Sequence, residues 1–235
     1  MKKTIFAVCL AAVMTYIAAF TLCVRALSAP KPVFSMGEAG MRIVLDAGHG
    51  GVDGGVVGKT TGVKESDLNL AIVFHLRDVL EDMGFDVTLT RKTEAGLYGT
   101  AAKGFKKRDM QRRKEIIEEA DPSLVISVHQ NFYPSKTSRG GQVFYKKTDD
   151  RAKKFALAVQ EQLNGLYAEE GAKARNAQAG EYFMLECSDS PSIIVECGFL
   201  SSPVDEGLLI TDAWQRKIAD GIAAGVMGYL SDFTA

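Results

Sequence analysis

Two histidines and one glutamate each come directly after a run of apolar residues that is typical of a buried strand. His49, His129 and Glu196 hold these places. In a parallel sheet the carboxyl ends of the strands meet at one edge, and ligands bind beyond that edge. Imidazole and carboxylate groups can hold a metal ion or move protons there. These side chains therefore predict a catalytic cleft at one edge of a sheet.

Glu196 has the least ordinary surroundings of these residues. Its neighbours are apolar, and an acid in such a place is rare unless it is paired or functional. Burial there should also raise its pKa, which suits a group that takes a proton from water. A lone histidine such as His75, in the middle of an expected helix, is more often structural than functional.

Glu65 is a third possible ligand beside the two histidines. Two imidazoles and one carboxylate with an open fourth position make a known catalytic zinc arrangement, in which a second carboxylate can act as general base. Glu65 precedes an expected helix, however, and acids favour helix N-termini for electrostatic reasons. From the residues alone, both explanations of Glu65 stay open.

The elements that must position these residues alternate between strand and helix. Strands are expected at residues 42–46, 85–90, 124–128, 141–145, 181–185 and 192–197, and helices at 66–83, 107–120, 150–169 and from Asp212, which is expected to cap the last helix. Such alternation is typical of an α/β domain with a mainly parallel sheet. We expect a single domain over residues 41–235, with about six strands in a twisted sheet flanked by helices.

The N-terminus has the pattern of an export segment. Two lysines precede an uncharged apolar run over residues 4–24, and Arg25 follows it. As a helix, a run of about 21 residues would span roughly 31 Å, enough for the apolar core of a bilayer. Residues 1–28 are predicted to be a signal peptide or a membrane anchor, two alternatives that stay open, and residues 29–40 a linker. The rest of the chain is expected to be exported.

The remaining features exclude other classes of function. The formal net charge is −1 and no basic stripe is interleaved with aromatic residues, so no nucleic-acid partner is expected. Residues 54–60 end like a phosphate-binding loop, but Asp53 stands where that loop needs glycine. Cys187 and Cys197 make no disulfide framework, and their spacing leaves open whether they pair.

Four stretches of the sequence carry a joint pattern: IVLDAGHGGVDGG at 43–55, KESDLNL at 64–70, VISVHQNF at 125–132 and PSIIVECGFLSSPVDEGLL at 191–209. Taken together, they resemble the zinc-dependent N-acetylmuramoyl-L-alanine amidases of the amidase 3 family. The resemblance implies one zinc ion per chain, held by His49, Glu65 and His129. It implies that Glu196 is the catalytic glutamate. The bond implied is the amide between N-acetylmuramic acid and L-alanine in peptidoglycan.

A narrower resemblance is to the spore-cortex, CwlD-like branch of this family. The chain shares with that branch a single N-terminal apolar segment and the absence of wall-binding repeats. The sequence motifs SVHQNF and RGGQVFY are also similar to it. This narrower resemblance implies that the substrate is a glycan strand with stem peptides and that cleavage takes place during cortex maturation. The peptide-free muramic acid that results later becomes muramic-δ-lactam. The expected place is the outer side of the cytoplasmic membrane, the cell wall or the cortex space, with membrane contact if the N-terminal segment is retained.

Further partners and alternatives complete the set of expectations. Asn131 and Arg175 are candidates for substrate contacts, although a solvated loop charge explains Arg175 as well. An activating protein partner stays open. The main alternatives are an inactive peptidoglycan-binding module and another zinc peptidase or deacetylase of the cell wall.

Overall fold

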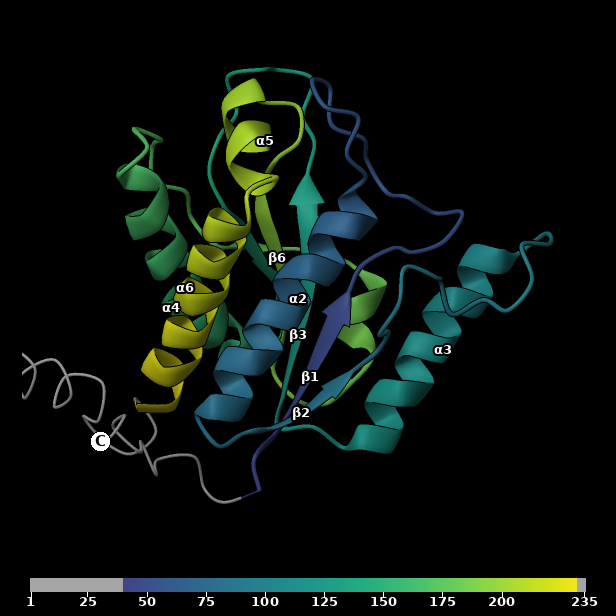
Figure 1. Cartoon of the computed structure of the whole chain (residues 1–235). Helices are drawn as coiled ribbons and strands as arrows, with labels where there is room; N and C mark the ends of the chain where they lie inside the picture. The colour runs from purple at the N-terminus through teal and green to yellow at the C-terminus, as the bar shows by residue number, and fades with distance from the viewer. Residues whose placement is uncertain (1–39, 232–235) are drawn as a thin grey trace, which may run out of the picture. The chain divides into compact units, whose positions relative to one another are not determined.

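A six-stranded sheet with the strand order β2-β1-β3-β6-β4-β5 forms the centre of the molecule (Figure 1). The structure, a computed structural model, describes residues 40–231, so the expected export segment at 1–28 and nearly all of the linker at 29–40 lie outside the described residues. The strands are β1 (Arg42–Ala47), β2 (Asp86–Leu89), β3 (Leu124–Asn131), β4 (Gln142–Tyr145), β5 (Gln178–Ala179) and β6 (Ser192–Phe199). All neighbouring strands are parallel except β4 and β6, which are antiparallel.

Helices cover both faces of this sheet. They are α2 (Glu65–Asp82), α3 (Phe105–Ala120), α4 (Asp150–Ala168), the 3-10 turn η1 (Phe183–Glu186), α5 (Pro203–Leu209) and α6 (Asp212–Ser231). In Figure 1, α2, α4 and α6 lie together on one side, and α3 lies apart from them. The expected fold class, an α/β domain with a mainly parallel sheet, is confirmed.

The strands bury side chains on both faces because successive residues point to opposite sides. Ile43 and Leu45 of β1 belong to the larger core, which α2, α4 and α6 cover. Val44 between them belongs to a smaller core on the other face, together with Ile117 of α3 and Met184 of η1. Near-continuous apolar strands are the consequence of this double burial.

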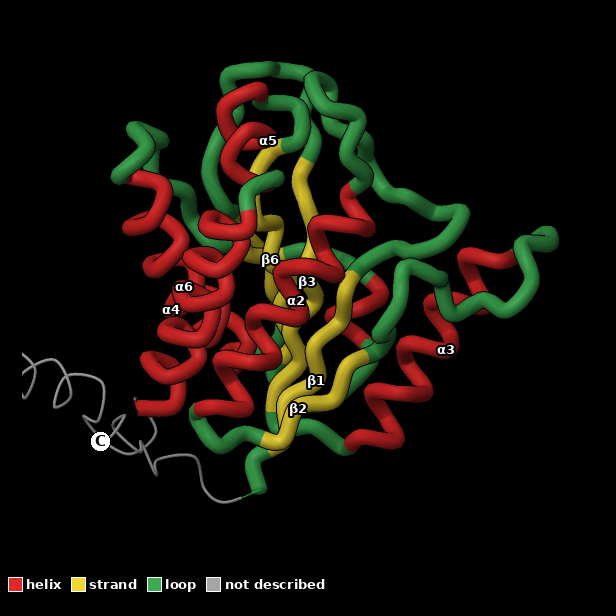
Figure 2. Tube along the Cα trace, in the orientation of Figure 1, coloured by secondary structure: helices red, strands yellow, loops and turns green. Residues whose placement is uncertain are grey.

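The long loops gather beyond the carboxyl ends of β1, β3 and β6 (Figure 2). This is the edge at which the sequence predicts a cleft. No helix within residues 40–231 is long and apolar enough to span a membrane.

The prediction of a strand at residues 181–185 is wrong. Residues Phe183–Glu186 form the 3-10 turn η1, in which the amide of Leu185 donates to the carbonyl of Tyr182 at 3.0 Å. Met184 and Leu185 are buried in the smaller core. A short apolar run cannot be distinguished from a buried helical turn by periodicity alone. The strand at this edge of the sheet, next to β4, is instead the two-residue β5.

The cap of the last helix is also one residue away from its expected place. The hydroxyl of Thr211 accepts a hydrogen bond from the amide of Trp214 at 3.3 Å, so Thr211 has the capping role. Asp212 is the first residue of α6 and pairs with His75 at 3.0 Å and with Arg216 at 2.8 Å. This pair supports the structural explanation of His75.

Helix α5 and the state of the cysteines were not foreseen. Pro203 begins α5, and the Ser202 hydroxyl before it accepts a hydrogen bond from the amide of Asp205 at 3.4 Å. Serine followed by proline is a typical start of a helix, so the pattern was present in the sequence. Cys187 and Cys197 are both free and buried, so the two do not pair.

Candidate metal centre

His49 leaves β1 through a turn that only a few residue types adopt. Its φ is +61°, and glycines 50 and 51 also have positive φ values. Histidine tolerates this left-handed region better than most residues. The turn places Nε2 of His49 3.3 Å from Oε1 of Glu65, while Nδ1 lies 3.2 Å from Asp53.

His129 approaches the same carboxylate from the middle of the sheet. It lies near the end of β3, and its Nδ1 is 2.9 Å from Oε1 of Glu65. The imidazole packs directly over Gly48, where a Cβ atom would collide with the ring. This explains the need for glycine at position 48.

Glu65 is the first residue of α2 and is almost fully buried. Its second oxygen accepts a hydrogen bond from the amide of Val56 at 2.8 Å, and Oε1 accepts one from the amide of Gln130 at 3.1 Å. Burial would raise the pKa of Glu65, but the hydrogen bonds and charges of His129 and His49 hold it well below its usual range. The carboxylate is therefore ionised and fixed in direction.

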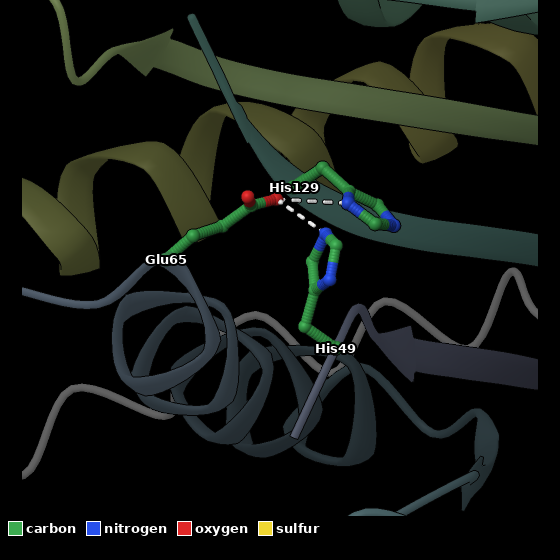
Figure 3. Close-up of side chains that lie close together, drawn as sticks. All are labelled: His49, Glu65 and His129. Atoms are coloured by element: carbon green, nitrogen blue, oxygen red, sulfur yellow. Dashed lines mark hydrogen bonds and ion pairs between the residues drawn. The ribbon is translucent and has the colours of Figure 1, made fainter. Parts of the chain in front are cut away.

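The ligating atoms of His49, Glu65 and His129 all lie within 4.8 Å of one another (Figure 3). Donors of a tetrahedral zinc site with bonds of about 2.0–2.1 Å are roughly 3.3 Å apart, which agrees with the His–Glu separations. Asp53 accepts from the other nitrogen of His49, as outer carboxylates often do at metal sites. The residues present therefore fit a zinc ion.

Glu196 lies beside this cluster on the neighbouring strand. It is paired with His129 in the parallel register of β3 and β6, so both side chains are on one face of the sheet. Its Oε2 atom is buried and has no hydrogen-bond partner within residues 40–231. Burial raises the pKa of Glu196 to about 7, and the charge of Glu65 acts in the same direction against the two imidazoles.

Two buried arginines hold the backbone that carries His49. Arg113 donates to the carbonyls of Ala47 at 2.7 Å and of His49 at 2.5 Å. Arg91 donates to the carbonyls of Ala47 at 2.8 Å and of Gly48 at 3.1 Å. Because carbonyls that point inward need donors, these guanidinium groups keep the turn in one conformation.

Two clefts adjoin the metal centre. The first, of about 320 Å³, has an apolar lining: Tyr98, Phe105, Met110, Tyr182, Phe183, Met184 and Ile194. The second, of about 350 Å³, is more polar and includes Gln130, Asn131 and Phe132. His49, His129 and Glu196 line both. A substrate could therefore extend across the site in two directions.

The two other candidate residues lie at different distances from the centre. Asn131 lines the more polar cleft and is partly buried. Arg175 lines neither cleft: its Nε donates to the carbonyl of Arg139 at 2.7 Å, and its guanidinium lies 4.4 Å from the ring centre of Phe199. Arg175 is thus a held, half-buried side chain rather than a solvated charge.

Some residues of the site were not singled out from the sequence. In the sequence, Asp53 served only as an argument against a phosphate-binding loop. In the structure, its carboxylate contacts His49 and forms an ion pair with Lys106 at 3.3 Å. Its position four residues after the histidine was the available sign. No pattern in the sequence places the aromatic residues of the first cleft beside the histidines.

A comparison with known families agrees with this geometry. The family model Amidase_3, described as N-acetylmuramoyl-L-alanine amidase, matches residues 43–227. The chain belongs to this family. The expected enzyme class, a peptidoglycan amidase, is thereby confirmed.

Individual relatives that are similar to this chain are amidases as well. The chain is 34% identical over 205 residues to the germination-specific N-acetylmuramoyl-L-alanine amidase of Bacillus subtilis, covering 86% of this amidase and 84% of the relative. It is 26% identical to AmiA of Escherichia coli, covering 81% and 76%. The solved CwlD amidase from Clostridioides difficile, in complex with the GerS lipoprotein, is similar with a TM-score of 0.77 and 33% identity, covering 81% of this chain and 98% of that one.

Proposed function

We propose that this amidase hydrolyses the amide bond between N-acetylmuramic acid and L-alanine with the help of one zinc ion. One observation carries the proposal. His49, Glu65 and His129 present donor atoms within 4.8 Å of one another, and the partnerless oxygen of Glu196 belongs to the adjacent strand position. A set of donors with a free base beside it is the arrangement that hydrolysis of an unactivated amide requires.

The residues divide the chemistry between them. When bound, zinc supplies a Lewis acid that polarises the scissile carbonyl and makes nearby water more acidic. Glu65 and the two histidines hold the ion, and Asp53 fixes the ring of His49 through its other nitrogen. Glu196 takes the proton of the attacking water and passes it to the leaving amine of L-alanine, a double role for which its buried, partnerless oxygen is free.

The substrate lies across the centre in this proposal. Glycan and stem peptide both leave from the scissile amide, and the two clefts are the proposed contacts for the parts of the substrate next to this bond. Asn131, with an amide group in the more polar cleft, is a proposed contact with the substrate.

The proposed setting is the spore cortex. The similarity to the germination-specific amidase of Bacillus subtilis supports this role. Removal of the stem peptide leaves a free lactyl carboxyl group, which muramic-δ-lactam formation needs. The amidase would then act outside the cytoplasmic membrane. The CwlD amidase was solved with the GerS lipoprotein, which supports a protein partner for this chain too.

Digestion of purified peptidoglycan tests the chemistry. The full chain, loaded with zinc, is expected to release free stem peptides that begin with L-alanine, together with glycan that carries free lactyl groups. Mass spectrometry identifies both products. Cleavage inside the peptide or release of acetate would make it a peptidase or a deacetylase, and binding without any release would make it a wall-binding module.

Complementation tests the cortex role. Expression in a Bacillus subtilis strain without its germination-specific amidase is expected to restore muramic-δ-lactam to the cortex. If peptidoglycan is cleaved in vitro while the lactam stays absent in this strain, the amidase acts elsewhere in the wall.

A further inference from the structure

A polar groove of about 620 Å³ lies outside both clefts of the metal centre. Residues of the loop before β4 and of the loop that follows α4 line it. Three of its side chains are cationic, namely Arg139, Lys173 and Arg175, and no acidic side chain is among the lining residues. A concave surface of one charge attracts ligands of the opposite charge.

The positive charge of the groove is only partly balanced. One buried carboxylate, Asp205, pairs with Arg139 at 3.0 Å. The other oxygen of Asp205 is already engaged by the amides of Gly140 and Phe199. Nη2 of Arg139 is buried and has no hydrogen-bond partner within the described part of the chain. The charge of one carboxylate therefore balances only part of the charge of three cationic side chains.

The guanidinium of Arg175 is also held in place without being neutralised. It donates to the carbonyl of Arg139 at 2.7 Å and to the side chain of Gln142 at 3.0 Å, both uncharged groups. The ring of Phe199 lies beneath it. An arginine fixed in this way loses little conformational freedom when it binds an anion.

The groove lies within reach of the catalytic glutamate. Gln142, one of its lining residues, is paired with Glu196 in the antiparallel register of β4 and β6. Paired residues lie on one face of neighbouring strands, which are about 4.8 Å apart. An extended peptide covers about 3.3 Å per residue. A stem peptide of a few residues that starts at the metal centre can therefore reach the groove.

We infer that this groove binds a free carboxylate of the stem peptide, through Arg139, Lys173 and Arg175. This inference rests on the proposed function, because the stem peptide is the part of the substrate that it recognises. Guanidinium groups match carboxylates with paired hydrogen bonds, and stem peptides carry carboxylates that the reaction does not consume. The groove thus favours substrates whose carboxylates are free over those in which they are amides.

Steady-state kinetics with two soluble muropeptides test the inference. One has free stem carboxylates, and in the other they have been converted to amides. The double variant Lys173→Gln/Arg175→Gln is expected to raise KM for the first about tenfold, as the loss of a charge-assisted hydrogen bond does. The kcat for this substrate and the KM for the amide form should change by less than about twofold. An equal rise for both substrates, or none for either, overturns the inference.

Two controls separate charge from folding. The matched variant Lys153→Gln/Lys154→Gln removes two exposed charges from α4 and should leave both KM values as they are. Lys173→Glu changes an exposed side chain that does not hold the loop. It should raise KM for the free carboxylate more than Lys173→Gln does, and no difference between them contradicts the inference.

Calorimetry separates this inference from the proposed function. The released stem peptide, which has no bond left to cleave, should bind to the wild-type amidase and bind more weakly to the double variant. If neither muropeptide is cleaved but this difference is present, the groove stands and the proposed reaction fails. If the variant binds peptide normally but loses activation by a partner protein, the groove belongs to that partner and the inference fails.

Discussion

At the scale of single residues, two glutamates in the same centre have opposite surroundings. Glu65 is surrounded by donors, which hold its pKa well below the usual range. Glu196 has a partnerless oxygen and a pKa of about 7. Environments that push the pKa values of two carboxylates apart divide their roles. Glu65 suits a permanent ligand, and Glu196 suits a group that gains and loses a proton.

Glu196→Gln should lower kcat by about a hundred to ten thousandfold, the usual contribution of general acid–base catalysis. Zinc content, measured by mass spectrometry of the metal, should be unchanged because Glu196 is not among the proposed ligands. Glu181→Gln, which neutralises an exposed glutamate, is the control and should keep full activity. Full activity of Glu196→Gln would remove Glu196 from the mechanism.

Replacement of the histidines distinguishes ligands from scaffold. His49→Ala and His129→Ala should each lower zinc affinity by at least about tenfold, since each removes a donor. His75→Ala is the matched control. It loses the pair with Asp212 and no donor of the candidate centre, so it should retain zinc. Unchanged zinc titrations in both site variants would refute the ligand assignment.

At the scale of elements, the centre depends on how closely β1 and β3 approach. Gly48 follows β1, and the ring of His129 occupies the space that a side chain at position 48 would need. Beneath this turn, the buried pair of Asp46 and Arg113 joins β1 to α3 at 2.5 Å. The elements therefore position His49 through backbone contacts that no single ligand provides.

Gly48→Ala should displace the His129 ring and lower zinc affinity, with little loss of secondary structure by circular dichroism. Gly165→Ala lies in α4 with open space around it. It should instead raise the free energy of unfolding by about 0.5–1 kcal/mol, because alanine restricts the unfolded chain more than glycine does. Normal zinc binding by Gly48→Ala would contradict the packing argument.

The Asp46 carboxylate makes the free energy of unfolding depend on pH in the acidic range. Burial would raise its pKa, but the Arg113 guanidinium and the hydroxyls of Ser127 and Thr90 lower it from 3.8 to about 2. A lowered pKa stabilises the fold above about pH 4 and loses this effect as pH falls toward 2. The contribution is about 2 kcal/mol. Urea unfolding of wild type and Asp46→Asn at pH 5 and at pH 2.5 should show the smaller pH effect in the variant.

At the scale of the whole molecule, the metal centre joins parts that are distant in sequence. Its residues come from the turn after β1, the start of α2, and strands β3 and β6. An ion that binds only this folded arrangement stabilises it according to its concentration. In the proposed function, the centre is thus both the catalytic site and, with its ion bound, a structural link at one edge of the sheet.

Zinc removal should therefore lower the melting temperature. At a zinc concentration a thousand times its dissociation constant, the stabilisation is about 4 kcal/mol, which scanning calorimetry detects as a shift of several degrees on chelation. A double variant His49→Ala/His129→Ala should show no such shift. An equal shift in this variant would place the stabilising ion elsewhere.

Much of this protein follows from its sequence because local rules decide it. Apolar runs predict most of the strands, and periodic apolar positions predict the long helices. The positions of His49, His129 and Glu196 at the ends of expected strands indicated a site. The role of Glu65 stayed ambiguous in the residues alone, since helix electrostatics explains an acid there equally well. The family motifs supported the ligand role, which the 2.9 Å and 3.3 Å contacts with the two imidazoles now favour.

Only the tertiary structure decided the features that depend on long-range packing. The turn η1 replaced an expected strand because Met184 and Leu185 found a core on the face of α3. The groove of Arg139, Lys173 and Arg175 exists because Asp205, distant in sequence, holds one of them and leaves the others free of a carboxylate partner. Sequence patterns record which side chains prefer burial, but they do not record which distant residues meet.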